Sequence, residues 1–461
     1  MHGTECLRTG PEVAPVRFAN MGPDKNQPEA ISGSMWRLAA SAFVVLAAEP
    51  CFVLVDTAVV GHLGAVPLGA LGIGGTLVSL VAMLGVFLDY GTTGRAARWF
   101  GAGRRGDAID EGIAATFLAL VLGIVAVGIG ELFAGPLIRL LAGGAGPTAR
   151  AAVTWFRVAA VGVPGMLVVL AGNGWMRGVQ ETRRPVQIVV LANVISAVAS
   201  PVLVYPLRFG LVGSAIANLG AQVIGGVLFL LVLRTERRPW SPRMNVVKAQ
   251  LRTGGDLFIR AVGFQVAALV AVSVAARMGT ARLGAFQVGL ECWVLTTLLL
   301  DSFAIAAQSL VGAALGRDDT REARRLAWQV ARYGAYAGIA LAIVLIPGWW
   351  LVPLAFTSSS PVRQQIQVLW PWLVALQPVA GVVFALDGVL VGAGDVGFLR
   401  TITLIATIGV YVPLTLIALG YGWGLGGIWA GLAASIVIRF LGMMLRTARG
   451  TWAVPGTRDS V

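Results

Sequence analysis

The chain has 461 residues, of which 57% are hydrophobic and 60 are glycine, whereas charged residues make up only 12%. Soluble domains carry about 25% charged residues, so an ordinary soluble protein is excluded and a lipid bilayer is the expected surrounding. The formal net charge of +13 would suggest nucleic acid binding in a soluble domain. Here, however, the basic residues gather in alternating loops between apolar segments, as in membrane proteins whose basic loops face the cytoplasm. We therefore expect no nucleic acid partner.

Segments long enough to cross a hydrocarbon core of about 30 Å, about 20 helical residues each, follow one another along the chain. The first six lie near residues 40–62, 69–97, 113–142, 152–176, 185–205 and 211–233. The second six lie near residues 257–277, 283–314, 328–356, 368–391, 399–420 and 424–445. The sequence thus predicts an all-α integral membrane protein with twelve transmembrane helices. An even number of spans places both termini on one side, which the basic loops assign to the cytoplasm.

The second group of six segments repeats features of the first. Three blocks align in the same order at offsets of 215, 214 and 212 residues. They are LGAVPLGALGIG (63–74) with MGTARLGAFQVG (278–289), NGWMRG (173–178) with DGVLVG (387–392), and the blocks that begin at Phe87 and Leu299. Because each half has six helices, both halves insert in the same orientation. This is a transporter arrangement with the substrate site between the halves.

The longest polar connection, RTERRPWSPRMNVVKAQLR (234–252), falls near the midpoint of the chain. The first residues of the chain are polar and lack the apolar stretch of a signal peptide. We therefore expect two pseudosymmetric six-helix lobes joined by this connection. The predicted units are a disordered cytoplasmic tail (1–34), an N-terminal lobe (35–234), a cytoplasmic linker (235–254), a C-terminal lobe (255–446) and a second cytoplasmic tail (447–461).

Residues that carry enzymatic or metal chemistry are sparse. The three cysteines, Cys6, Cys51 and Cys292, form neither a disulfide framework nor a CxxC metal site. The two histidines, His2 and His62, belong to no cluster with metal-ligand spacing, and no GxxxxGK[ST] phosphate-binding loop is present. We expect no enzyme, no metal and no cofactor, and an energy source other than ATP bound by this chain.

Two acids inside the first predicted helix are the strongest functional signal. An ionised carboxylate at the bilayer centre costs about 2.5 to 3.5 kcal/mol on insertion scales. Glu49 and Asp56 are seven residues apart, hence on one helix face, and Pro50 between them removes a backbone donor and favours a kink. A proline-kinked helix with two acids is a candidate for a bend driven by protonation. The alternative is a structural acid paired with a polar neighbour.

Polar residues in other predicted helices are candidates for the walls of a cavity. Asn193, Ser196 and Ser200 form a stripe at i, i+3 and i+7, and Asn218 lies one turn before Gln222. These side chains either face the same cavity as Asp56 or hold helices together by hydrogen bonds. The candidate residues of the substrate cavity are Asn173, Asn193, Gln287, Glu291 and Asp301.

The remaining membrane acids are interpreted mainly as structural. Asp89 and Asp301 occupy equivalent places in the repeat and are expected to cap helices or form pairs near the Arg-rich loops. Asp387 precedes a glycine inside the tenth predicted helix. Asp256 and Arg260, at i and i+4, are expected to form an ion pair with each other.

Three motifs carry a resemblance to a known family. At EPCFVLVDTAVVGHLG (49–64), FLDYGTTGRAARWFGAG (87–103) and QPVAGVVFALDGVLVGAGD (377–395), the sequence resembles the multidrug and toxic compound extrusion (MATE) family, particularly its DinF-like branch. The resemblance extends from about residue 36 to residue 446. It implies twelve helices in two pseudosymmetric lobes, a central cavity and cation-coupled antiport. It also implies small amphipathic, often cationic, substrates. We expect a monomer in a bacterial cytoplasmic membrane.

The resemblance also implies a cation-coupling site in the N-terminal lobe. Asp56 matches the Asp of the family's first helix, whereas Ser196 stands where Asn is usual, Ser200 where a second Asp is usual, and Asn218 where Thr is usual. One of the two usual carboxylates is therefore missing. A sodium ion needs several oxygen ligands and compensating charge, whereas a proton needs one titrating group. We therefore expect coupling to H⁺ rather than Na⁺ through Asp56, with Glu49 as a possible second acid.

These features favour a proton-coupled antiporter that exports amphipathic or cationic drugs or metabolites by alternating access. One alternative is a sodium-coupled antiporter of the same family. A second is a flippase for lipid-linked precursors, which shares the two-lobe architecture but commonly has a basic cavity and extra helices. A channel or receptor, which needs no deep titrating acid, is the remaining class.

Overall fold

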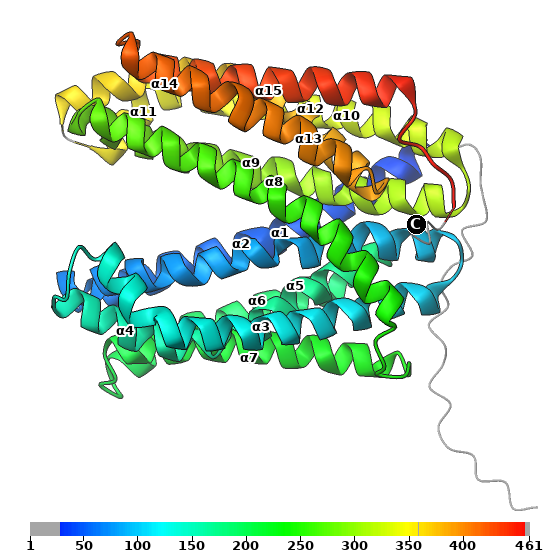
Figure 1. The fold of residues 1–461 in the computed structure, drawn as a ribbon, viewed down its shortest axis with the longest axis horizontal. Helices are drawn as coiled ribbons and strands as arrows, with labels where there is room; N and C mark the ends of the chain where they lie inside the picture. The colour runs from blue at the N-terminus through cyan, green and yellow to red at the C-terminus, as the bar shows by residue number, and fades with distance from the viewer. Residues whose placement is uncertain (1–27, 358, 457–461) are drawn as a thin grey trace, which may run out of the picture.

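The computed structural model describes residues 28–357 and 359–456, and over these residues every regular element is a helix, with no strand (Figure 1). The N-terminal lobe contains α1 (Pro28–Gly61), α2 (Ala65–Gly101), α3 (Arg105–Leu141), α4 (Pro147–Ala160), α5 (Val163–Gly178), α6 (Arg183–Val204) and α7 (Leu211–Thr235). The C-terminal lobe contains α8 (Met244–Arg277), α9 (Thr280–Gly316), α10 (Thr320–Leu345), α11 (Gly348–Phe356), α12 (Ser360–Gly392), α13 (Val396–Ala406), the π-helical segment η1 (Thr407–Tyr411), α14 (Val412–Gly420) and α15 (Gly424–Arg449).

Among the described residues, 11 helices are long and apolar enough to cross a membrane, and counting the bent pair α4–α5 as one span brings the number to 12. The all-helical membrane fold predicted from the sequence is thus confirmed. Long apolar helices suit a bilayer because all their backbone hydrogen bonds are made within the segment.

Two segments predicted as single helices are broken in the structure. The segment 152–176 bends by 49° between α4 and α5, because Pro164 in the first turn of α5 has no backbone N–H to continue the α4 ladder. The segment 328–356 stops at Leu345 and resumes at Gly348, with Pro347 between the two helices. Proline inside an apolar run therefore divides it without changing the number of spans.

The ends of the lobes differ from the boundaries drawn from the sequence. Helix α1 begins at Pro28, so residues 28–34 are helical rather than part of a tail, and Met35 and Leu38 pack into the core of the other lobe. The expected disorder of residues 1–27 lies outside the described part of the chain. Helix α8 begins at Met244, which shortens the connection between the lobes to residues 236–243.

The C-terminal segment is also packed rather than free. After α15 ends at Arg449, the side chain of Trp452 is buried. The guanidinium of Arg98 in α2 donates hydrogen bonds to the carbonyls of Val454 and Gly456. It also donates to the carbonyl of Ala393 after α12. Arg98 therefore joins the N-terminal lobe to two parts of the C-terminal half.

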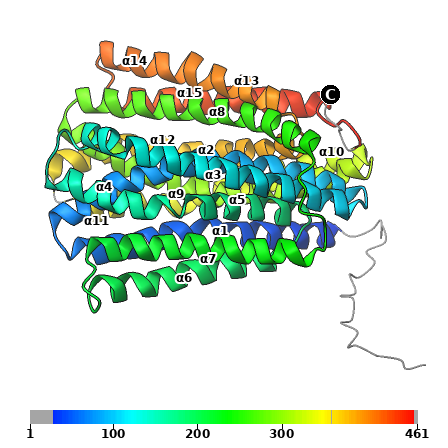
Figure 2. The same cartoon turned by 60° about the horizontal axis from the view of Figure 1, so that its bottom comes forward.

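The two lobes lie side by side and meet most closely where the C-terminal segment lies (Figure 1). The ribbons of the two lobes spread apart toward the opposite end (Figure 1). Within the N-terminal lobe, α1, α6 and α7 run side by side (Figure 2). At the close end, α2 and α9 pack through glycines. A Cβ atom at Gly101 would lie 2.0 Å from the carbonyl oxygen of Ala313, and one at Gly316 would lie 2.0 Å from that of Arg98. Only glycine allows this approach.

The orientation of these helices is testable by chemical labelling. We expect single cysteines at Arg105, Arg238 and Arg325 to be shielded from an impermeant thiol reagent added to intact cells, and a cysteine at Pro147 to react. The reason is the concentration of basic residues on the loops that carry the first three positions. The background variant has Cys6, Cys51 and Cys292 replaced, and labelling after permeabilisation controls for buried sites. Labelling of the first three positions in intact cells would reverse the orientation.

Candidate functional site

Asp56 lies in a buried polar cluster within the N-terminal lobe. Its side chain is 3% exposed. One carboxylate oxygen accepts a hydrogen bond from the Ser200 hydroxyl of α6 at 2.6 Å, and the other accepts from the Ser214 hydroxyl of α7 at 2.7 Å. The indole N–H of Trp155 in α4 donates to the Ser214 oxygen at 3.1 Å. Four helices therefore fix the position of one carboxyl group.

Other predicted coupling residues lie near this cluster without bonding to Asp56. The Ser196 hydroxyl donates to the backbone carbonyl of Ala217 at 2.7 Å, so it links α6 to α7. The Oδ1 atom of Asn218 is buried without a hydrogen-bond partner among the described residues. Ser200, which the family resemblance placed in the coupling site, lies beside Asp56. The sequence analysis missed Ser214, which lies one turn before Asn218 on the same face of α7 and could have been found from that spacing.

Glu49 and Pro50 are exposed on α1, away from the hydrogen bonds of Asp56. The helix continues through Pro50 without a break. Glu49 has no ion-pair partner within the described residues, so its role as a second acid stays a prediction.

The predicted cavity residues do not converge on one site. Asn173 is buried in α5, and its Oδ1 atom has no partner within the described residues. Asn193 donates to the carbonyl of Val189 in its own helix. Gln287 donates to Glu291 at 2.9 Å, and this pair is exposed on α9. Their assignment to a substrate cavity stays a prediction.

Asp301 lies at the boundary between the lobes. It accepts a short hydrogen bond from the hydroxyl of Tyr90 in α2. The neighbouring Asp89 forms a buried ion pair with Arg177 of α5 at 2.7 Å. The two repeated acids are thus partnered. Asp89 is buried within the N-terminal lobe and Asp301 is partly buried between the lobes, whereas both were expected near the Arg-rich loops. A cavity of about 180 Å³ between the lobes is lined by Tyr90, Asp301 and Asp387, among others.

The prediction that Asp256 and Arg260 form an ion pair with each other is wrong. Asp256 pairs with Arg400 of α13 at 2.5 Å, and Arg260 pairs with Asp387 of α12 at 2.6 Å. One helical turn brings i and i+4 side chains together, but partners on adjacent helices compete for both residues. Arg439 of α15 binds the same oxygen of Asp387 at 3.1 Å.

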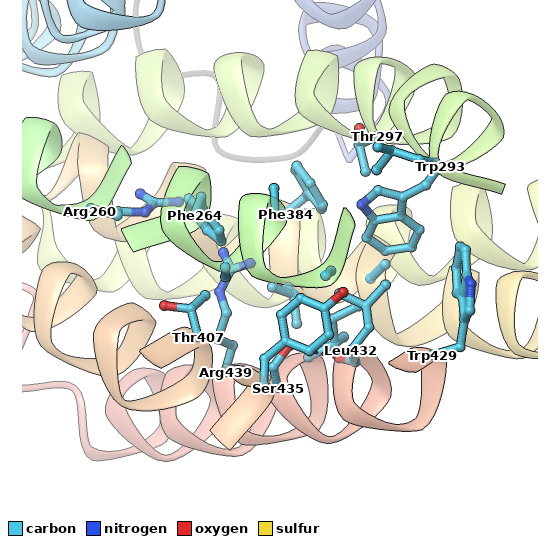
Figure 3. A pocket seen from close by; sticks show the side chains of 18 of the residues that line it. Arg260, Phe264, Trp293, Thr297, Phe384, Thr407, Trp429, Leu432, Ser435 and Arg439 are labelled. Atoms are coloured by element: carbon cyan, nitrogen blue, oxygen red, sulfur yellow. Dashed lines mark hydrogen bonds between the residues drawn. The ribbon is translucent and has the colours of Figure 1, made fainter. Parts of the chain in front are cut away.

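A pocket of about 320 Å³ lies inside the C-terminal lobe next to this ion cluster (Figure 3). The labelled side chains come from α8, α9, α12, η1 and α15, and the guanidinium groups of Arg260 and Arg439 approach the ring of Phe264 (Figure 3). Segment η1 contributes Thr407 and Tyr411 to the wall. Single π-helical turns are frequent at functional sites because they redirect side chains.

Sequence reasoning missed this pocket, although one signal was available. Arg439 is the only charged residue within the predicted span 424–445, and an ionisable residue in a transmembrane helix is by default a functional candidate. Its partner Asp387 was noted, but the connection between them depends on helix packing. Among the described residues, no group of three or more Cys, His, Asp or Glu side chains is placed to hold a metal ion.

Comparisons with known proteins agree with the fold and the motifs. The MatE family model matches residues 41–202 and 257–417. The chloroplastic protein DETOXIFICATION 44 of Arabidopsis thaliana is 32% identical over an alignment that covers 99% of this chain and 89% of that protein. DNA damage-inducible protein F of Escherichia coli is 28% identical, with 91% and 93% covered. The fold matches a MOP superfamily transporter from Pyrococcus furiosus with a TM-score of 0.84 at 21% identity, over 92% of this chain and 96% of that one. The chain therefore belongs to the MatE family of multidrug and toxin efflux transporters.

Proposed function

We propose that this chain exports small amphipathic organic compounds in exchange for protons, with Asp56 as the proton carrier. The observation that supports this most directly is the burial of the Asp56 carboxyl group between the Ser200 and Ser214 hydroxyls. No Lys, Arg or His side chain forms an ion pair with Asp56 among the described residues. An ionised carboxylate without a counter-charge is costly inside the membrane, so binding a proton removes that cost.

The two serines suit both protonation states of this carboxyl group. When Asp56 is ionised, both hydroxyls donate to it, as in the structure. When Asp56 is protonated, a hydroxyl oxygen can accept from the new O–H, because a serine hydroxyl is both donor and acceptor. The carboxyl group of Asp56 can therefore keep a hydrogen bond to a serine in both protonation states.

Sodium coupling is the weaker reading of the same geometry. Hard cations are bound by several oxygen ligands with compensating negative charge. Asp56 supplies the one carboxylate of this cluster, and the Ser196 hydroxyl is engaged with the Ala217 carbonyl. A proton needs only the carboxyl group and its two serine partners.

We propose a place in a bacterial cytoplasmic membrane, with both termini in the cytoplasm and the protein acting as a monomer. The positive-inside distribution of basic loops supports this orientation. With that orientation, the close packing of α2 and α9 at Gly101 and Gly316 supports a state closed toward the cytoplasm. Alternating access would then separate these helix ends when the transporter opens inward.

Coupling can be tested with purified protein in proteoliposomes. We expect a panel of cationic, neutral and anionic fluorescent compounds to reveal at least one that accumulates inside vesicles with an acidic interior. A driving force of about 100 mV corresponds to about 2.3 kcal/mol per proton. At about 1.4 kcal/mol per decade, this force sustains an approximately fiftyfold gradient of a neutral compound exchanged one for one.

Two controls decide the coupling ion. A protonophore is expected to collapse the accumulation, and vesicles without protein are expected to show none. A sodium gradient alone, at equal pH on both sides, is expected to drive no uptake. Accumulation that survives the protonophore and follows sodium would contradict proton coupling.

A further inference from the structure

We propose that the pocket inside the C-terminal lobe binds a small amphipathic organic anion through the carboxylate group of that anion. The aromatic walls of the pocket hold the apolar part of the anion. This inference names a substrate class for the transport proposed above and rests on that proposed function for its role in export. It differs from the cationic substrates that the family resemblance implied. The binding step itself does not depend on which ion drives transport.

The charge of the pocket favours an anion. Arg260 and Arg439 belong to its lining, and no carboxylate does. Asp387 lies behind them, and a single oxygen of this residue accepts from both guanidinium groups, at 2.6 Å and 3.1 Å. One negative charge therefore faces two positive charges. Asp301, in the adjoining cavity, accepts a hydrogen bond from Tyr90.

Unused donors beside the pocket add a second, independent observation. Arg439 is 6% exposed and Trp429 is 2% exposed. The Nε of Arg439 and the indole Nε1 of Trp429 are buried without a hydrogen-bond partner within the described residues, and so is the Nε of Arg260. Buried N–H groups are almost always paired in folded proteins. A bound carboxylate, which only accepts hydrogen bonds, matches the two arginine donors at one end of the pocket, whereas Trp429 lies ten residues before Arg439 on α15, at the other end (Figure 3).

Aromatic side chains supply the apolar part of the site. The ring centre of Phe264 lies 5.1 Å from the guanidinium carbon of Arg439 and 5.6 Å from that of Arg260, so this ring helps to hold both cations in place. Trp293 and Phe384 line the pocket with Phe264 (Figure 3). The cavity therefore combines a cationic end with an aromatic chamber, which suits a carboxylate attached to a ring system.

The pocket is connected to the boundary between the lobes. Arg260, Phe264 and Phe384 line both this pocket and the adjoining cavity of about 180 Å³. That cavity also includes Met83 and Tyr90 of α2, from the other lobe. A compound held in the C-terminal lobe would therefore lie next to the surface that rearranges when the lobes move.

The proposal can be tested with three probes of nearly equal shape. These are 1-naphthoate, its neutral amide 1-naphthamide, and the cation 1-naphthylmethylammonium. Binding is measured by equilibrium dialysis on the full-length protein in detergent, without any ion gradient. We expect 1-naphthoate to bind at least tenfold more tightly than the amide, and the ammonium compound more weakly still. Equal binding of all three, or tighter binding of the ammonium compound, would overturn the proposal.

Substitutions assign the preference to this pocket. Arg439→Gln is expected to reduce the preference for naphthoate over the amide from at least tenfold to less than threefold, while the amide still binds. The matched control is Arg446→Gln in the same helix, because Arg446 pairs with Asp395 outside the pocket. This control is expected to keep the full preference. A preference retained by Arg439→Gln would place the anion elsewhere.

A milder variant covers the case in which Arg439→Gln does not fold, since this residue also links α15 to Asp387 of α12. Arg439→Lys keeps a positive charge beside Asp387 and removes the unpaired Nε donor, and we expect it to weaken naphthoate binding severalfold without affecting the amide. Equal loss for both probes would indicate a packing role only.

Two further measurements separate the remaining explanations. Displacement of naphthoate by micellar phosphatidylglycerol, with no displacement by excess benzoate, would assign the pocket to a lipid headgroup and overturn the proposal. Selective naphthoate binding without proton-driven naphthoate transport would leave the binding site standing and contradict the proposed proton coupling.

Discussion

Replacing Asp56 with asparagine is expected to abolish proton-driven efflux, with a loss of at least a hundredfold in the initial rate, while leaving the protein folded in the membrane. The amide is nearly the same size as the carboxyl group, and its oxygen can still accept from one of the two serines while its NH2 group donates to the hydroxyl oxygen of the other. It cannot take up or release a proton in the transport cycle. Because no basic side chain is paired with Asp56 within the described residues, removal of the charge leaves no unpaired partner behind.

The measurement is the efflux rate in proteoliposomes at several pH values, with expression level and melting temperature as checks on folding. The matched control is Ser196→Ala, which removes a buried hydroxyl from the same lobe. The Ser196 hydroxyl donates its hydrogen bond to the carbonyl of Ala217 and not to Asp56. We expect this control to retain most of the activity.

The efflux rate of Ser200→Ala is expected to fall between those of the two variants, since a hydrogen bond to a charged group contributes about 1.5 to 3 kcal/mol. Normal efflux by Asp56→Asn would move the proton site to another acid, with Glu291 and Asp301 next to examine.

Features that depend on a single helix were predictable from the sequence. Hydropathy fixed the number of spans because a membrane helix must satisfy its backbone within one segment. The position of Asp56 in α1 follows from an acid inside an apolar run. Its pairing with Ser200 was anticipated through the family resemblance, which supplied the missing information about which helices are neighbours.

Features that depend on packing between helices were not predictable in this way. The spacing of Ser214 and Asn218 places both on one face of α7, but the contact of that face with Asp56 depends on how α7 packs against α4 and α6. For the same reason Arg260 finds Asp387 on α12 rather than Asp256 on its own helix. Within a membrane, an ion pair forms wherever packing brings opposite charges together, so sequence spacing alone favours a local partner too strongly.

The C-terminal segment illustrates the same limit at the surface of the lobes. It was predicted as a cytoplasmic tail, yet Trp452 is buried and the backbone beyond it accepts hydrogen bonds from Arg98. Arg98 belongs to the motif that begins at Phe87, which was noted for the internal repeat and for the family resemblance. Its hydrogen bonds to backbone carbonyls depend on where α12 and α15 end, which side-chain patterns do not specify.

A second large effect is expected from Gly101→Val, which we predict to open the cytoplasmic end of the transporter. In the structure, a Cβ at this position would lie 2.0 Å from the carbonyl oxygen of Ala313 on α9. Because the obstructing atom belongs to the backbone, no change of side-chain rotamer can relieve the clash. Overpacking of this kind typically costs about 1 to 3 kcal/mol, and at about 1.4 kcal/mol per decade the closed state would lose roughly five- to a hundredfold in population.

We expect this substitution to reduce efflux by at least tenfold, since alternating access requires the closed state in every cycle, and to lengthen the distance between the lobes. That distance is measured by electron paramagnetic resonance between spin labels at Arg184 and Arg321, which are exposed on the two lobes, after replacement of the native cysteines. The matched control is Gly72→Val in the same helix, where an added Cβ meets no atom within 4 Å. Both variants place the same β-branched residue in α2, and only Gly101→Val meets the backbone of α9. An unchanged distance distribution in Gly101→Val, together with normal efflux, would show that the contact between α2 and α9 is not the cytoplasmic gate.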